Sequence, residues 1–143
     1  MRHTSLWILL TLLSVGLVTS LLTDASARDK KKADRVFEMR TYTTAPGRLD
    51  ALHARFRDHT NKIFVKHGMQ LVGYWTPTDE ETAANTLVYI LAYPSMEARE
   101  ASWKAFRDDP DWKKAFAASK ADGPIVTKVE SQFLVPTDYS PIK

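Results

Sequence analysis

The segment from Val36 to Thr76 constrains the fold more than any other part of this 143-residue chain. Its first residues, Val36 to Tyr42, are rich in β-branched and aromatic side chains, which is typical of a strand. A Pro-Gly pair interrupts that strand, and apolar residues then recur at spacings of three and four, which predicts a helix from about Arg48 to His67. Met69 to Thr76 has strand composition again. The segment therefore predicts a βαβ unit.

The predicted helix has one apolar face. Its inward stripe is expected to contain Leu49, Leu52, Phe56, His59, Ile63 and His67. Arg55 is among the charged residues that this pattern points away from the core. Gly68 stands where a helix commonly ends in the left-handed conformation.

The rest of the chain predicts two more strands and two more helices. Thr86–Tyr93 is a nearly continuous apolar run, which indicates a strand buried on both faces. Ser95 and Asp109 are suited to cap two helices, with Pro110 at the first position of the second. The last strand is expected over Ile125–Val135. The resulting order, β-α-β-β-α-α-β, predicts an α+β fold: a ferredoxin-like antiparallel sheet with helices on one face.

The doubly buried third strand has a consequence for assembly. Helices on one face leave the other face of a small sheet uncovered, and a second copy of the chain is the economical cover. We therefore expect a homodimer.

The first 27 residues read as a signal peptide. An apolar run from Leu6 to Leu22 follows Arg2, and Ala25-Ser26-Ala27 supplies the small residues of a cleavage site. This predicts an exported protein, periplasmic or secreted. The alternative is an uncleaved membrane anchor, because the run approaches the length that spans a bilayer. Residues 28–35 are expected to be a basic, flexible linker. The alternative is that these residues are weakly attracted to anionic lipid headgroups.

Composition excludes several kinds of site. The chain has no cysteine, which rules out a disulfide, a thiolate nucleophile and a zinc–thiolate centre. The net charge of +3 is carried by the linker, so the domain from residue 36 to 143 is neutral and no nucleic-acid groove is expected. No histidine pair has a metal-binding spacing, and no cofactor fingerprint is present. We predict neither a metal nor a cofactor.

Several stretches together resemble the NIPSNAP family. They are Met39-Arg40-Thr41-Tyr42, Pro46-Gly47, Lys66-His67-Gly68, Val72-Gly73-Tyr74-Trp75, Ala92-Tyr93, Asp109-Pro110-Asp111-Trp112 and the stretch from Leu134 to Pro141. The resemblance covers nearly all of residues 36–143. It implies the dimeric α/β barrel, in which two ferredoxin-like sheets pack face to face.

The resemblance does not supply a mechanism. Eukaryotic members of this family are associated with mitochondria and vesicle traffic through protein contacts, whereas the bacterial ones lack an agreed biochemical role. Proteins that share only the fold include cofactor-independent monooxygenases and haem-degrading enzymes, and that is an analogy of fold alone.

Polar residues on inward faces are the candidates for a site in the pocket expected between sheet and helices. They are Arg40, Tyr42, His59, His67, Tyr74, Trp75 and Trp103. His59 would serve as a base, acid or ligand, and Arg40 would hold a carboxylate or an enolate-like oxygen. Plainer interpretations stand beside these: His59 as a core residue, Arg40 as the partner of Glu38, His67 as a cation at a helix end, and the tryptophans as core.

Two functions remain open. The first is an exported homodimeric module that binds a small organic ligand or a protein partner. The second is a cofactor-independent monooxygenase or isomerase that acts on a small aromatic or keto substrate through His59 and Arg40. A closed pocket that brings His59 close to Arg40 or Tyr42 would favour the enzyme, whereas a pocket filled by Trp and Phe would favour the binding module.

Overall fold

A computed structural model describes residues 35–143 of the chain. The predicted signal peptide, and the predicted linker up to residue 34, lie outside the described residues. Within residues 35–143 no helix is both long enough and apolar enough to cross a membrane.

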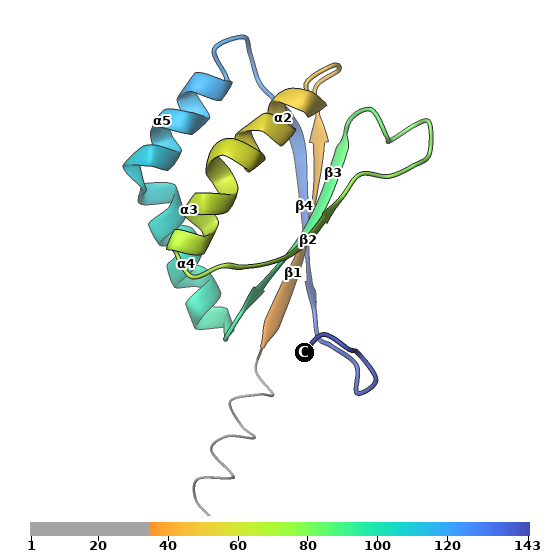
Figure 1. The fold of residues 1–143 in the computed structure, drawn as a ribbon, viewed down its shortest axis with the longest axis vertical. Helices are drawn as coiled ribbons and strands as arrows, with labels where there is room; N and C mark the ends of the chain where they lie inside the picture. Colours follow the sequence, from red (N-terminus) through yellow and green to blue (C-terminus); the bar gives the residue numbers. More distant parts are fainter. Residues whose placement is uncertain (1–34) are drawn as a thin grey trace, which may run out of the picture. The chain divides into compact units, whose positions relative to one another are not determined.

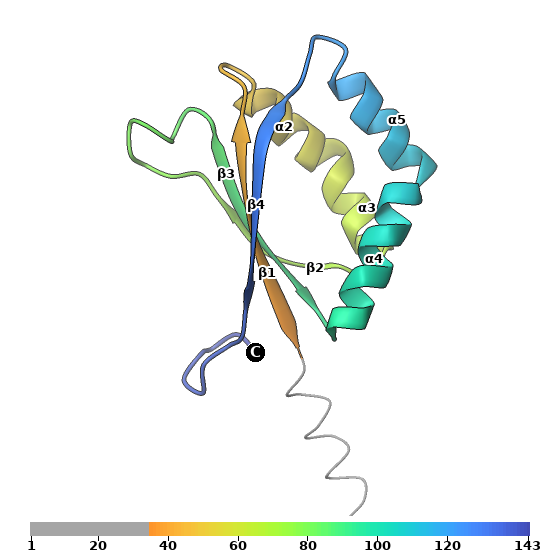
Figure 2. The same ribbon diagram turned by 180° about the vertical axis from the view of Figure 1, so that it is seen from behind.

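Four strands form one antiparallel sheet in the order β2-β3-β1-β4. The strands are β1 (Val36–Thr44), β2 (Gln70–Trp75), β3 (Thr86–Tyr93) and β4 (Val126–Leu134). The helical elements are α2 (Leu49–Arg55), the π-helical turn η1 (Phe56–Thr60), α3 (Asn61–Lys66), α4 (Met96–Asp108) and α5 (Pro110–Ser119). Figures 1 and 2 show all the helices on one side of the sheet. The predicted α+β class and order of elements are confirmed, with α2, η1 and α3 forming the single predicted helix.

Local chemistry sets the ends of the helices as predicted. The Ser95 hydroxyl accepts a hydrogen bond from the backbone N–H of Ala98, so it caps α4. The Asp109 carboxylate accepts from two backbone N–H groups at the start of α5, and Pro110 occupies the first turn of that helix. Gly68 has a φ of 78°, which is the left-handed conformation that ends the first helix.

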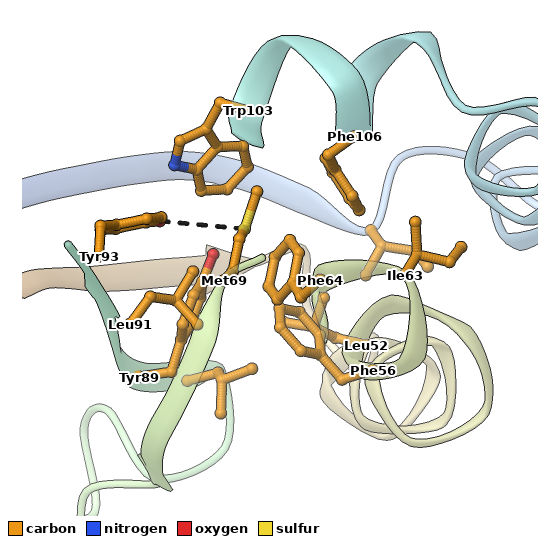
Figure 3. Packing of buried hydrophobic residues seen from close by; sticks show 12 residues of the cluster. Leu52, Phe56, Ile63, Phe64, Met69, Tyr89, Leu91, Tyr93, Trp103 and Phe106 are labelled. Carbon is orange, nitrogen blue, oxygen red and sulfur yellow. Dashed lines mark hydrogen bonds between the residues drawn. The ribbon is translucent and has the colours of Figure 1, made fainter. Parts of the chain in front are cut away.

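The core between sheet and helices is mainly aromatic. Tyr89 of β3 is fully buried, and the Phe56 ring meets it edge to face with centroids 5.2 Å apart. The Phe64 ring packs against Phe106 of α4 at 4.7 Å. Figure 3 shows the Phe rings and Leu52 reaching from the helices toward Tyr89 of the sheet. Besides the cavity described below, a second hollow of about 430 Å³ lies beside this core, lined by residues of the first helix and of β2 and β3 that include Phe56, Tyr74 and Leu87.

The two faces of β3 differ. Leu87, Tyr89, Leu91 and Tyr93 point to the helices and are buried. Val88 and Ile90 point to the opposite face, where they are half-buried. The prediction of a buried strand is thus confirmed for the helix side, and the cover of the other side stays a prediction.

The helix-free face also carries an exposed tryptophan. Trp75 of β2 is 51% exposed, and its indole lies against Gly73. A Cβ added at Gly73 would lie only 2.5 Å from indole Cη2, so the strand needs glycine there for the ring to lie flat. At one end of this face the C-terminal residues turn back, and Pro136 and Ile142 line a hollow with Phe37 and Ile90.

Candidate functional site

The π-helical turn changes which residues of the first helix face inward. A π turn contains more residues than an α turn, so each residue advances by a smaller angle around the axis. His59 is therefore rotated to the exposed side, and Thr60 takes the inward position with 1% of its surface exposed. The prediction that His59 lies on the inward stripe is wrong for this reason.

Arg55 departs from the sequence pattern in the opposite direction. It was expected to point away from the core, but only 5% of its surface is exposed. The helix that carries it packs against α5 as well as against the sheet, so its buried face is wider than one apolar stripe. Arg55 lies where α2 meets the π turn, and the Thr60 hydroxyl donates to its backbone carbonyl across that turn at 3.1 Å.

A cavity of about 130 Å³ lies between the sheet and the helices at this point. Its wall is mostly aromatic and aliphatic, with three polar side chains. The lining residues are Tyr42, Arg55, Phe56, Thr60, Phe64, Phe106, Trp112, Phe116, Val126 and Val129. Phe116 of α5 and Val129 of β4 are 38% and 47% exposed, so the cavity reaches the surface between these two elements.

The Arg55 guanidinium is held by aromatic rings rather than by an acid. Its central carbon lies 5.5 Å from the centre of the Trp112 ring and 5.4 Å from that of Phe116. Within residues 35–143 its side chain donates one hydrogen bond, from Nη1 to the Ser119 hydroxyl at 3.2 Å, and its buried Nε has no acceptor. Burial lowers the pKa of Arg55.

A second polar cluster surrounds Glu38 of β1, whose side chain is fully buried. Arg99 donates to both carboxylate oxygens, from Nε at 3.0 Å and from Nη2 at 2.8 Å. Arg40 and Ser131 each donate to Oε1 at 2.6 Å. The Trp103 indole N–H and the Tyr93 hydroxyl reach Oε2 at 3.1 and 3.3 Å.

These donors keep Glu38 ionised. Burial by itself would raise the pKa of this carboxyl, but the hydrogen bonds from Arg99 and Ser131 and the charge of Arg40 together lower it to about 2. Because every acceptor position is occupied by a donor of the protein, the cluster ties α4 and β4 to β1. We assign it a structural role. The pair with Glu38 is the plainer of the two interpretations that the sequence leaves open for Arg40, and the other donors come from segments more than 50 residues away and carry no local signal.

Three of the predicted site residues, Arg40, Tyr42 and Trp103, lie next to one another. The Arg40 guanidinium carbon lies 4.4 Å from the centre of the Trp103 ring and 5.6 Å from that of Tyr42. Of these three residues, only Tyr42 lines the cavity. Arg40 and Trp103 are committed to Glu38.

The other four predicted site residues lie elsewhere. His59 lines an open surface depression with charged residues of α3 and α5. His67 Nε2 lies 2.7 Å from Oδ2 of Asp109, the residue that caps α5. The Tyr74 hydroxyl donates to Asn61 at 2.8 Å, and Trp75 lies on the helix-free face. The structure therefore does not bring His59 to Arg40.

No group of three or more acidic or histidine side chains within residues 35–143 has the arrangement of a metal site. The polar groups on the cavity wall are a guanidinium and two hydroxyls, from Arg55, Tyr42 and Thr60. Such a set can bind an oxygen-bearing small molecule.

Comparison with solved structures gives several similar proteins of the same kind. One is an uncharacterised NIPSNAP-like domain protein from Burkholderia xenovorans, which is 19% identical to this chain. The alignment spans 76% of this chain and 90% of the Burkholderia chain, with a TM-score of 0.66. A NIPSNAP family protein of unknown function from Agrobacterium tumefaciens is 25% identical, with coverage of 78% and 96% and a TM-score of 0.66.

One further similar structure has a named activity. It is a variant of SnoaB, a cofactor-independent oxygenase from Streptomyces nogalater, which is 16% identical, covers 76% of this chain and 99% of its own, and has a TM-score of 0.50. At that identity the likeness shows the fold alone. No curated protein matches the chain. The family model NIPSNAP matches residues 37–141, which is almost the whole described domain. The chain therefore belongs to the NIPSNAP family.

Proposed function

We propose that this protein is an exported homodimeric module that binds a small organic molecule in the cavity between its sheet and its helices. The observation that carries the proposal is the cavity itself, with its aromatic wall and a few polar groups. Small-molecule sites in proteins have this composition: an apolar concave wall with a small number of placed polar side chains.

The size of the cavity indicates the size of the ligand. Its volume of about 130 Å³ is close to that of an engineered cavity of about 150 Å³ that binds benzene. A ligand whose apolar part is about the size of one aromatic ring therefore fits the cavity. The opening between α5 and β4 provides a route from solvent without unfolding of the core.

Binding is favoured over catalysis by the placement of the acid–base groups. His59, the predicted base, is exposed on the outer side of its helix, while Arg40 is bonded to Glu38. The cavity wall is formed largely by Phe and Trp side chains, and among the described residues that line it there is no histidine or carboxylate to act as a base. The fold shared with SnoaB does not by itself transfer its oxygenase activity to this chain.

The proposed dimer uses the helix-free face of the sheet. Val88, Ile90 and Met39 lie on this face and are half-buried, and Trp75 is exposed beside them. An apolar sheet face is stabilised by a second layer, and a second copy of the same face supplies it. Export rests on the predicted signal peptide alone.

Binding of fluorobenzene, followed by ¹⁹F NMR line broadening, tests the cavity. We expect fluorobenzene to bind the wild-type domain, and we expect Val126→Phe to abolish binding because the new ring fills the cavity. Val65→Phe is the matched control, since Val65 is 59% exposed and does not line the cavity. Circular dichroism and thermal unfolding establish that both variants fold. Absence of binding to the wild type, or equal binding by folded Val126→Phe, would contradict the proposal.

A further inference from the structure

The charge on Arg55 has no counter-ion within the described chain. Buried arginines are normally paired with a carboxylate, because an unpaired buried charge is costly. Only two acidic residues within residues 35–143 are buried, Glu38 and Asp109. Glu38 is engaged by Arg40 and Arg99, and Asp109 by Lys66 and His67. Neither forms an ion pair with Arg55.

The guanidinium is nevertheless fixed in place. Trp112 and Phe116 lie against it, and the Ser119 hydroxyl accepts from Nη1 while donating to the Phe116 carbonyl at 2.9 Å. Aromatic rings hold the cation but do not accept its in-plane N–H bonds as oxygen atoms do. The buried Nε of Arg55 thus lacks an acceptor within the described residues, and the side chain lines the cavity.

We propose that Arg55 is the anchor for the carboxylate of the ligand, so that the cavity takes a small monocarboxylic acid with an apolar body of about one ring. This inference rests on the proposed function, because it names the chemical class of the molecule that the cavity binds. A planar carboxylate matches the fork of N–H groups on a guanidinium and would supply both the missing charge and the missing acceptors.

The wall of the cavity favours one negative charge over two. Arg55 is its only cationic side chain, and the other polar groups are the hydroxyls of Tyr42 and Thr60. A phosphate monoester would bring a second charge that nothing on the wall neutralises. A carboxylate is fully compensated by one guanidinium, and its apolar body then meets the rings of Phe56, Phe64 and Phe106.

Isothermal titration of the protein with benzoate and with its neutral analogue benzamide tests the assignment. Hydrogen bonds to a charged group predict that benzoate binds about 10- to 100-fold more tightly than benzamide. Arg55→Gln should remove this preference while fluorobenzene still binds, which shows that the cavity is intact. Arg57→Gln, a change at an exposed arginine two residues away on the same helix, is the matched control and should keep the preference.

The remaining outcomes all decide against the carboxylate assignment. Equal affinity for benzoate and benzamide, or a preference for benzoate that survives Arg55→Gln, overturns the assignment. If fluorobenzene binds and benzoate does not, the cavity binds neutral molecules, so the assignment fails and the proposed function stands. If none of the three probes binds the wild type, both fail.

Discussion

Arg55 and Trp112 form a cation–π contact at the wall of the inner cavity, with 5.5 Å between the guanidinium carbon and the ring centre. The contact joins the first helix to α5 and holds a buried charge that has no acid beside it among residues 35–143. Arg40 makes a similar contact with Trp103, but Arg40 also pairs with Glu38. The two arginines therefore differ in the presence of a paired carboxylate, and the first two predictions follow from that difference.

Replacement of Arg55 by methionine is expected to leave the ligand-free protein at least as stable as the wild type. The change removes a buried charge that lacks a counter-ion among residues 35–143 and keeps an apolar stem of similar length, so we expect a gain of about 1 kcal/mol in the free energy of unfolding. Urea unfolding measures it. A loss above about 2 kcal/mol would show instead that Arg55 is mainly a packing residue.

Replacement of Glu38 by glutamine is expected to be strongly destabilising. It leaves the Arg40 guanidinium without a negative charge and leaves Arg99 with only the exposed Glu100, and breaking a buried ion pair in this way costs about 3–5 kcal/mol. Urea unfolding of this variant beside Arg55→Met provides the comparison. If the two variants lose equal stability, the distinction between a structural and a ligand-binding arginine is wrong.

The pH dependence of stability follows from the same carboxylate. Its pKa falls from 4.5 to about 2 in the folded protein, so the native state favours the ionised form. The resulting stabilisation is complete above pH 4.5 and is lost as the pH falls toward 2. We expect the free energy of unfolding of the wild type to decline across this window and that of Glu38→Gln to decline less. Parallel curves for the two proteins would contradict the assignment.

Asp109 links the end of the first helix to the start of α5, and its two roles can be separated. Asp109→Asn keeps an oxygen to cap the helix but loses the charge that attracts Lys66 and His67, whereas Asp109→Ala loses both. The hydrogen bonds from Lys66 and His67 hold the pKa of this carboxyl well below its usual range. We therefore expect the melting temperature to fall in the order wild type, Asn variant, Ala variant.

The control for Asp109 is Asp111→Asn, which changes an exposed acid 3.8 Å from the same Lys66. Differential scanning calorimetry at pH 7 should place this control at the wild-type melting temperature. A control as unstable as the Asp109 variants would mean that general surface charge, rather than the buried link, sets the stability of this junction.

Replacement of Val88 by lysine tests the helix-free face as the dimer interface. Val88 is half-buried on that face, so the charge should leave the monomer folded and weaken the dimer by about 100-fold or more. Analytical ultracentrifugation gives the dissociation constant, and Val65→Lys on an exposed helix position is the control. A wild-type domain that sediments as a monomer at micromolar concentration would contradict the proposed assembly.

The features that the sequence predicts correctly depend on local chemistry. Ser95, Asp109 and Gly68 end helices where their short side chains or their backbone freedom require, and alternation along β1 places Glu38, Arg40 and Tyr42 on one face. The order of elements follows from such signals. So does the family resemblance, since the matched stretches lie in these same elements.

The candidate site was less predictable because it depends on tertiary packing. The π turn rotates His59 outward and Thr60 inward, and nothing in a pattern of threes and fours marks the extra residue. Arg55 is buried by α5, a helix that follows it by more than 50 residues. A charged residue beside an apolar stripe is read as solvent-exposed unless the second packing surface is known.

Native mass spectrometry of the protein purified from its own host tests assembly and ligand binding together. We predict an ion of two chains, each beginning at Arg28 after removal of the signal peptide, with a small organic acid retained by each chain. The same spectrum after Arg55→Gln should show the dimer without the acid. A monomer, or a dimer that is empty in the wild type, would contradict the proposal that this chain forms a dimer in which each copy holds a small carboxylic acid.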